Sequence, residues 1–379
     1  MKPVYLDYSA ATPLDSRVLA VMMPFFYDSF YNPSALYKGA RDVKLALETA
    51  RASVSRTIGA RPSEIIFTAG GTESANLAVK GVMDKYQGSE LVISAIEHDA
   101  VLKPANNYKF KVAPVNEKGL IDLHKLEMLI SDKTVLVSVM YANNEVGTVQ
   151  PIREIAKLVS QIRKDRKKRS CKTPLYLHTD ACQAPQYLEI NVARLGVDLM
   201  TLNGGKIYGP KQSGVLYCRA GVLISPQILG GGQENGNRSG TENISACVGF
   251  AKALELIMRN KADTGRTISE LAKYFTSELE NRFETVINGH QKLRLPNNVH
   301  VTFRGADNER ILFSLDSQSI YASVGSACSA SSDEPSHVLK AMGISDENAR
   351  SSLRFSLGRE TTKSEIDQTL RALDIAIKA

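Results

Sequence analysis

Short apolar runs alternate with helical patterns along the first two thirds of the chain. Runs that are mostly β-branched or aliphatic occupy residues 64–68, 91–95, 135–140, 175–178, 198–202 and 215–218. Strands that are buried on both faces have this composition, because helices cover both sides of a parallel sheet. Helical patterns lie between these runs at residues 41–58, 73–85, 123–130 and 152–162. The alternation predicts an α/β domain built on a mainly parallel sheet.

The pattern changes near residue 243. A long helix is expected through residue 256 and beyond, followed by a second helix at 268–283, and these lead into short strands at 298–303 and 353–356 with helices at 309–315, 337–342 and 363–375. This order predicts a smaller α+β domain. We expect residues 15–255 to form the large domain, and residues 1–14 together with 256–379 to form the small one. The small polar residues at 326–332 predict a mobile loop.

Composition limits the class of protein. The 379 residues are 43% hydrophobic and 23% charged, which is typical of globular proteins and excludes collagen-like, coiled-coil and largely disordered chains. No apolar stretch reaches the roughly 18 residues that cross a bilayer, and the first residues lack the apolar core of a secretory signal. We therefore expect a cytoplasmic protein with no membrane partner. The five cysteines form no CxxC pair, so neither a disulfide framework nor a metal site is expected.

The net charge of +7 comes almost entirely from one segment. Residues 163–172 contain seven Lys or Arg and one Asp, which leaves the rest of the chain close to neutral. This basic run is interpreted as a solvated extension at the end of a helix, and the alternative is a docking patch for RNA or an acidic protein. Because the positive charge does not spread over a face, direct nucleic-acid binding is not expected.

A glycine turn follows the first expected strand. The residues AGGTES at 69–74 open a helix, and backbone amides at a helix N-terminus favour an anion, with the Thr72 hydroxyl as a further donor. The segment has neither the Walker lysine nor GxGxxG. A phosphate site and a plain capped turn are therefore both open at this point.

Two further motifs follow expected strands. In HTDACQ, residues 178–183, Asp180 lies where the carboxyl end of a parallel strand can present a carboxylate to a protonated ring nitrogen, or it caps the next element. In NGGKIYGP, residues 203–210, Lys206 is held in glycine-rich backbone and can form a Schiff base if its amine is desolvated, or it is simply solvated. A phosphate site, a carboxylate and a lysine together are the groups that hold pyridoxal phosphate.

At this point the sequence resembles the cysteine desulfurases of the NifS/IscS class, within the class V aminotransferase-like enzymes. The resemblance covers nearly the whole chain, and ten motifs in the family's order carry it: LDYSAATP (6–13), YNPSALYKGAR (31–41), AGGTESANLA (69–78), EHDAV (97–101), ANNEVGTVQP (142–151), HTDACQA (178–184), GGKIYGPK (204–211), GGGQENGNRSGTEN (230–243), SVGSACSASSDEPSHVL (323–339) and SSLRFSLGRETT (351–362). It implies the aspartate aminotransferase type of fold, pyridoxal 5'-phosphate as cofactor and L-cysteine as substrate.

The resemblance also implies roles for individual residues. Lys206 is the lysine that binds the cofactor covalently. Asp180 pairs with the pyridine nitrogen, His98 stacks on the ring, and Gln183 bonds the phenolic oxygen. The remaining implied contacts are Gly71 and Thr72 to the phosphate, Thr241 to the phosphate of the neighbouring subunit of a homodimer, and Arg354 with Asn144 to the substrate carboxylate.

Cys328 is the expected sulfur carrier. It lies in SACSASS among small residues, whereas Cys182, Cys218 and Cys247 stand in apolar or strand contexts and Cys171 follows the basic run. The resemblance implies that the freed Lys206 removes the substrate Cα proton and that the Cys328 thiolate, with His98 as proton acceptor, then takes the sulfur as a persulfide. The persulfide would pass to a sulfur-acceptor protein, in iron–sulfur cluster assembly or in a tRNA-thiolation relay.

The chain departs from the family pattern before the lysine. The usual Ser and His that contact the cofactor are replaced by Asn203, which can still donate, and by Gly205, which offers a bare amide. Other functions also remain open: a selenocysteine lyase, a related aminotransferase, or a cofactor-poor relative that binds RNA or protein through the basic run.

Overall fold

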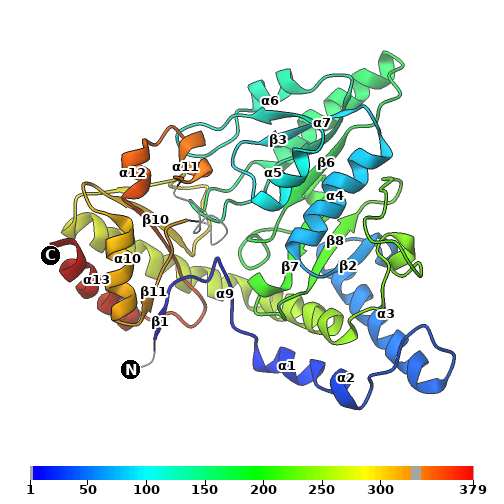
Figure 1. Cartoon of the computed structure of the whole chain (residues 1–379), viewed down its shortest axis with the longest axis horizontal. Coiled ribbons are helices and arrows are strands. Elements are labelled where there is room, and N and C mark those ends of the chain that lie inside the picture. The colour runs from blue at the N-terminus through cyan, green and yellow to red at the C-terminus, as the bar shows by residue number, and fades with distance from the viewer. Residues whose placement is uncertain (1–2, 326–333, 379) are drawn as a thin grey trace.

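The computed structural model describes residues 3–325 and 334–378, and it has two lobes joined by one long helix (Figure 1). The larger lobe is built on a seven-stranded sheet in which β8 alone is antiparallel to its neighbours. Each strand follows an apolar run of the sequence. The strands in spatial order are β2 (Ile65–Thr68), β8 (Gly214–Cys218), β7 (Leu199–Asn203), β6 (Tyr176–Asp180), β5 (Thr134–Ser138), β3 (Glu90–Ser94) and β4 (Lys109–Ala113).

Helices cover both faces of this sheet. Because successive strand residues point to opposite faces, Val92 packs into one core while Leu91 and Ile93 pack into another. The first core lies under α1 (Ser16–Met22), α3 (Lys38–Ile58), α6 (Leu123–Leu129), α7 (Ile152–Lys168) and α8 (Val192–Leu195); the second lies under α4 (Gly71–Lys85) and α5 (Asp99–Ala105). The short helix α2 (Pro24–Tyr27) follows α1. The predicted α/β class with a mainly parallel sheet is confirmed.

The smaller lobe has its own hydrophobic core. Its three-stranded antiparallel sheet has the order β12 (Ser352–Ser356), β10 (Asn298–Phe303), β9 (Thr285–Ile287), and a parallel pair joins β1 (Val4–Tyr5) to β11 (Ile320–Tyr321). The helices of this lobe are α10 (Asn308–Ser317), α11 (His337–Ala341), α12 (Asp346–Arg350) and α13 (Lys363–Lys378). Val4 and Leu6 lie in the same core as residues of α13, so the N-terminal segment packs with the C-terminal part of the chain. The predicted domain boundaries remain a prediction.

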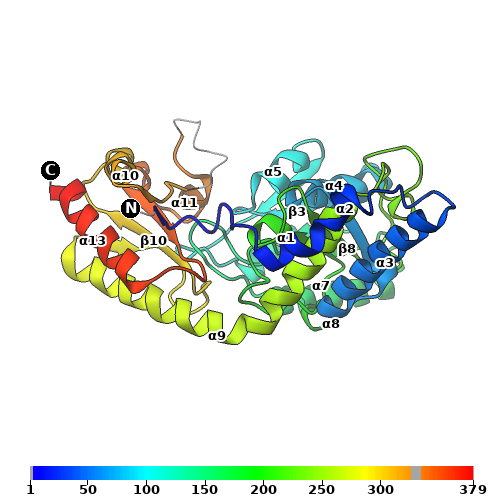
Figure 2. The same cartoon turned by 90° about the horizontal axis from the view of Figure 1, so that it is seen from below.

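One helix, α9 (Ile244–Arg282), replaces the two that the sequence pattern predicts. Its first part, with Phe250 and Leu254, is buried in the large core, and its last part, with Phe275 and Leu279, is buried in the small core. Figure 2 shows the helix running beneath both lobes. The polar residues between the two buried parts bridge the lobes and need no apolar face of their own. Reading that polar stretch as a break between helices was therefore wrong.

The basic run is partly structural. Residues 163–168 continue α7, and Arg166 is only 2% exposed because its guanidinium donates to the carbonyls of Ser131, Thr134, Thr173 and Pro174 at 2.5–3.1 Å. Arg163 donates to the Leu175 carbonyl at 2.7 Å and pairs with Asp198. Treating the whole run as a solvated extension was wrong for these two arginines. Since they hold the end of α7 against the sheet, the run presents less free positive charge than its composition indicates.

One strand of the seven-stranded sheet, β4, has no counterpart in the predicted pattern. In β4 most side chains are exposed, since it lies at the edge of the sheet, and its alternation of lysines with apolar residues hides it among loop segments. Within the described residues, no helix combines the length and apolar character that crossing a bilayer requires.

Two buried histidines make stability depend on pH. Burial lowers the pKa of His178 to about 4 and that of His300 to about 3, below the value near 6.5 of an unfolded chain. From pH 6.5 down to about 4 the unfolded chain therefore binds protons that the native chain does not, and stability falls as the pH falls. At pH 5 each histidine accounts for a loss of about 2 kcal/mol.

We expect His178→Gln to reduce the loss of unfolding free energy between pH 7 and pH 5 by about 2 kcal/mol. Gln can keep hydrogen bonds with Ser138 and Thr201, the two neighbours of the His178 ring, but does not titrate. Denaturant unfolding at the two pH values measures the difference. The exposed His124→Gln is the control and should leave it unchanged. Equal pH dependence in all three proteins would contradict the assignment.

Candidate active site

A cavity of about 210 Å³ lies at the carboxyl ends of β5, β6 and β7, where a parallel sheet presents its ligand-binding edge. The N-terminus of α4 forms one wall, and Arg354 on β12 reaches in from the small lobe. The lining residues are Ser9, Ala10, Gly71, Thr72, His98, Ala100, Met140, Ala142, Asn144, Asp180, Cys182, Gln183, Asn203, Lys206 and Arg354. Segments from the start, middle and end of the chain thus meet in one cavity.

Lys206 ends a single 3₁₀ turn, Gly204–Lys206, that begins directly after β7. The amide nitrogen of Gly205 donates to Asn203 Oδ1 at 3.0 Å, which fixes the turn. The Lys206 Nζ donates to the carbonyls of Ser9 at 2.8 Å and Ala10 at 2.5 Å. Burial lowers the pKa of the amine, and the Arg354 cation lowers it further, while nearby acidic groups act in the opposite direction. The cavity therefore holds a desolvated primary amine, as nucleophilic lysines require.

Asp180 ends β6 and lines the same cavity, only 7% exposed. Its Oδ1 accepts a hydrogen bond from the amide of Cys182 at 2.9 Å, so the carboxylate makes a local turn contact and also faces the cavity. The pairing of Asp180 with a ring nitrogen remains a prediction.

A second carboxyl, Glu97, is completely buried near Asp180 and accepts a hydrogen bond from the Met140 amide at 2.5 Å. Burial and the charge of Asp180 raise the pKa of Glu97 well above its usual range. This environment favours the uncharged form of Glu97.

The glycine turn brings the start of α4 to the cavity. Gly70 has φ 144°, a conformation that favours glycine, and Gly71 and Thr72 begin the helix. A Cβ atom on Gly71 would lie 2.7 Å from the Cys182 sulfur, so only glycine lets α4 approach β6 this closely. Gly71 and Thr72 line the same cavity as Lys206, and amides at a helix N-terminus favour an anion.

Three more predicted residues line the cavity, and hydrogen bonds orient two of them. His98 is the N-cap of α5, and its Nδ1 accepts from the Ala100 amide at 3.0 Å, so the neutral ring carries its proton on Nε2. Gln183 Nε2 donates to the Ser9 carbonyl at 3.0 Å. Asn144 lies in the segment after β5.

Arg354 is 1% exposed and binds groups from two other segments. Its Nη2 donates to Asp7 Oδ1 at 2.6 Å and its Nη1 to the Asn144 carbonyl at 3.1 Å. Its buried Nε has no hydrogen-bond acceptor among the described residues. A guanidinium in this position can bind a carboxylate in the cavity.

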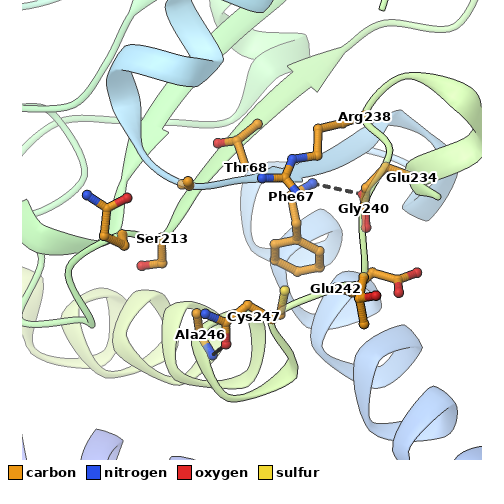
Figure 3. A pocket seen from close by; sticks show the side chains of 14 residues that line it. Phe67, Thr68, Ser213, Glu234, Arg238, Gly240, Glu242, Ala246 and Cys247 are labelled. Carbon is orange, nitrogen blue, oxygen red and sulfur yellow. Dashed lines mark hydrogen bonds between the residues drawn. The ribbon is translucent and has the colours of Figure 1, made fainter. Parts of the chain in front are cut away.

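Two predicted residues lie outside this cavity. Gly205 lines an adjoining hollow with Gly71, Thr72 and Asn203. Thr241 lines a second pocket of about 250 Å³, shown in Figure 3, together with Arg238 and the buried Cys247. In that pocket the Phe67 amide donates to Glu234 Oε2 at 2.9 Å. Cys328 lies outside the described residues.

Comparison with known proteins agrees with this geometry. The family model described as class-V aminotransferase matches residues 4–369. A cysteine desulfurase IscS of Dictyoglomus turgidum is 41% identical, with 100% of this chain and 95% of the relative covered. One of Methanosarcina thermophila is 40% identical, with 98% and 91% covered.

Among solved structures, a NifS-like protein of Rickettsia africae matches with a TM-score of 0.88 and 33% identity, covering 100% of both chains. A protein described as SspA in complex with cysteine matches with a TM-score of 0.82 and 33% identity, covering 95% of this chain and 100% of that one. The chain belongs to the cysteine desulfurase family of class V aminotransferase-fold enzymes. This family is pyridoxal phosphate-dependent, and the predicted cofactor and fold are thereby confirmed.

The donor set of the cavity fits this cofactor. An aldehyde needs a desolvated amine, a phosphate needs backbone amides at a helix N-terminus, and a protonated pyridine nitrogen needs a carboxylate. Lys206, the start of α4 and Asp180 supply these three groups within one cavity. Among the residues that the structure describes, no group of three His, Cys, Asp or Glu is arranged to hold a metal ion.

Sequence reasoning missed three contributors to this desulfurase site. The carbonyls of Ser9 and Ala10 bind the lysine amine, and the buried carboxyl of Glu97 lies near Asp180. Both sets stand inside motifs of the family, LDYSAATP and EHDAV. Any residue has a backbone carbonyl, so the residue type does not show which carbonyls will bind the lysine. The burial of Glu97 depends on tertiary packing. Neither role can therefore be predicted from residue types.

Of the two glycines before Lys206, Gly205 has room for a side chain and Gly204 does not. A Cβ on Gly205 would make ordinary contacts, 3.5 Å from Asn203 Oδ1 and 3.8 Å from Lys211, whereas a Cβ on Gly204 would lie 2.1 Å from Ser213 Oγ. We expect Gly205→His to fold normally and to bind pyridoxal phosphate about tenfold more tightly, because the ring adds a donor beside the phosphate site.

Fluorescence titration of the dialysed apoprotein measures the affinity for the cofactor. Gly204→Ser is the matched control and should lower the thermal midpoint and weaken binding. A Gly205→His protein with weaker cofactor binding than the wild type would show that the hollow does not face the phosphate.

Proposed function

We propose that this chain converts L-cysteine to L-alanine and transfers the sulfur to Cys328 as a persulfide, with pyridoxal phosphate as cofactor. The observation that supports this most directly is the desolvated Lys206 amine in one cavity with Asp180 and Arg354. The relatives named cysteine desulfurase match the full length of the chain at about 41% identity. A solved neighbour with 33% identity is described in complex with cysteine.

The cavity residues would hold the cofactor as follows. Lys206 would bind the aldehyde, Asp180 would face the pyridine nitrogen, and Gln183 would donate to the phenolic oxygen. The phosphate would lie against the Gly71 and Thr72 amides, with Asn203 beside it, and His98 would cover the ring. When bound, this cofactor supplies an electron sink for the charge that develops on the substrate Cα.

Arg354 would bind the substrate carboxylate. Its guanidinium is already oriented by Asp7 and by the Asn144 carbonyl, so little freedom is lost on binding. The buried Nε without an acceptor can donate to a carboxylate oxygen that enters the cavity. The Asn144 side chain lines the same region and would add a further hydrogen bond.

Lys206 would remove the Cα proton. Its pKa is lowered by burial, so its neutral form is more populated at neutral pH than that of a surface lysine. The carbonyls of Ser9 and Ala10 accept hydrogen bonds from the amine and hold it beside the cavity in a defined position.

Cys328 would then attack the sulfur of the substrate as a thiolate. The predicted transfer of its proton to His98 would require the ring to release the Ala100 amide from Nδ1, because Nε2 already carries a proton. A sulfur–sulfur bond forms, the substrate carbon–sulfur bond breaks with its electron pair going to carbon, and a proton completes alanine. The carbon is reduced while the two sulfurs are oxidised to the persulfide level, so no other oxidant or reductant is required.

The other thiols are poor candidates for this attack. Burial raises the pKa of Cys182 and Cys247, and it raises the pKa of Cys218 to about 12. A thiol with a raised pKa has almost no nucleophilic thiolate at neutral pH. Cys171 lies at the end of α7, outside the residues that line the cavity.

We expect Cys328→Ser to abolish the formation of alanine from L-cysteine while leaving cofactor binding unchanged, because the serine hydroxyl is not ionised and cannot take the sulfur. Alanine release in the presence of a reductant measures turnover, and alkylation followed by mass spectrometry locates the persulfide. Cys171→Ser should behave as the wild type does. Alanine formation by Cys328→Ser at the wild-type rate would exclude Cys328 as the acceptor.

We also propose a homodimer. Thr241 lies in a pocket outside the cavity of its own chain, as a residue that reaches a neighbour's phosphate would. Large apolar side chains are exposed over residues 19–45, with Leu36 at 89% and Phe30 at 66%, which supports an interface there. A monomer in sedimentation at micromolar concentration would contradict the proposal.

The proposed acceptor of the persulfide sulfur is a cytoplasmic protein of iron–sulfur cluster assembly or tRNA thiolation.

A further inference from the structure

The ANNEVGTVQP motif contains a buried carboxylate that the proposed chemistry does not use. Glu145 is 1% exposed, although it directly follows Asn144 of the cavity wall. Burying a carboxylate is costly unless hydrogen bonds compensate. Its surroundings therefore indicate what it holds in place.

The backbone around Glu145 is rigid. Asn143 Oδ1 accepts from the amides of Glu145 and Val146, both at 2.9 Å, and Asn298 Nδ2 donates to the Glu145 carbonyl at 2.8 Å. Gly147 has φ 74°, and a Cβ at this position would lie 2.8 Å from Asn298. The turn therefore requires glycine at position 147. The carboxylate of Glu145 therefore projects from a fixed point beside the cavity.

The Glu145 carboxylate lies against the described residues on both sides of the segment 326–333. Ser336 Oγ donates to Glu145 Oε2 at 2.5 Å, and Ser336 is also the N-cap of α11, accepting from the Val338 amide at 3.1 Å. On the other side, a Cβ built on Gly325 would lie only 3.6 Å from the same Oε2. One oxygen thus accepts a hydrogen bond from one flank of the segment that contains Cys328 and lies close to the other flank.

Each flank is also bonded to a wall of the cavity. Ser323 and Arg354 exchange backbone hydrogen bonds at 3.2 and 2.7 Å before the segment. After it, the His337 Nε2 is 2.9 Å from the carbonyl of Glu97, the residue before His98. Glu145 lies between the two flanks.

We propose that Glu145 is a positioning residue for sulfur transfer, fixing Ser336 beside Gly325 at the two ends of the segment that contains Cys328. The inference rests on the proposed function, in which Cys328 accepts the sulfur. Glu145 is not among the residues that line the cavity, and it acts through the flanks of the Cys328 segment.

The test is rapid mixing of the holoenzyme with L-cysteine, with two signals recorded. The visible spectrum of the cofactor reports substrate binding, and quenching with an alkylating agent followed by mass spectrometry reports the Cys328 persulfide. In Glu145→Ala we expect the spectral change at the wild-type rate and persulfide formation slowed about tenfold to a hundredfold, because a charged hydrogen bond is lost.

Three further variants separate positioning from damage to the fold. Ser336→Ala removes the partner of Glu145 and should slow the persulfide to a similar degree. Glu145→Gln keeps an acceptor for the Ser336 hydroxyl and should restore most of the rate. Ser345→Ala removes a cap of the same kind from α12, where Ser345 accepts from the Asn348 amide at 3.3 Å, and should change nothing.

The two proposals fail in different ways. A wild-type enzyme that forms no Cys328 persulfide would overturn the proposed function and this inference with it. A normal persulfide rate in both Glu145→Ala and Ser336→Ala would overturn the inference alone. A spectral change slowed as much as the persulfide would also overturn it, because Glu145 would then act on substrate binding through Asn144.

Discussion

The site depends on one requirement: the Lys206 amine must be kept away from bulk water. Lys206 is held by the carbonyls of Ser9 and Ala10, and burial lowers its pKa. Neither effect is local to the lysine, because the two carbonyls belong to the N-terminal segment and the walls belong to both lobes. The reactive state of one side chain therefore requires the whole chain to be folded around it.

The architecture meets this requirement by crossing the boundary between the lobes more than once. The N-terminal segment packs in the small core and then passes beside Lys206, and α9 is buried in both cores. Arg354 lies on a strand of the small lobe and donates to Asp7 and to the Asn144 carbonyl. The substrate-binding guanidinium and the cofactor-binding lysine are thereby fixed relative to each other by contacts among three distant parts of the sequence.

Much of this could be predicted from the sequence, for reasons that are physical. Asp180, Asn203 and the glycine turn at 69–74 follow strands of one parallel sheet, and such strands end at a common edge, so their meeting was predictable. The edge strand β4 could not be predicted, since its exposed residues resemble a loop. The unbroken helix α9 could not be predicted either, because its polar middle has no buried face. The structural roles of Arg166, Glu97 and Glu145 depend on which backbone groups surround these side chains after folding. Residue type alone does not specify those neighbours.

Covalent attachment of the cofactor tests the central assignment most directly. Treating the holoenzyme with borohydride, digesting it and sequencing the modified peptide by mass spectrometry identifies the lysine that carries the pyridoxyl group. We expect that group on Lys206. Lys211 is the nearest informative competitor, because it lines the adjoining hollow and its Nζ donates to the Thr12 carbonyl at 2.9 Å. A pyridoxyl group on Lys211, or on no lysine at all, would contradict the account.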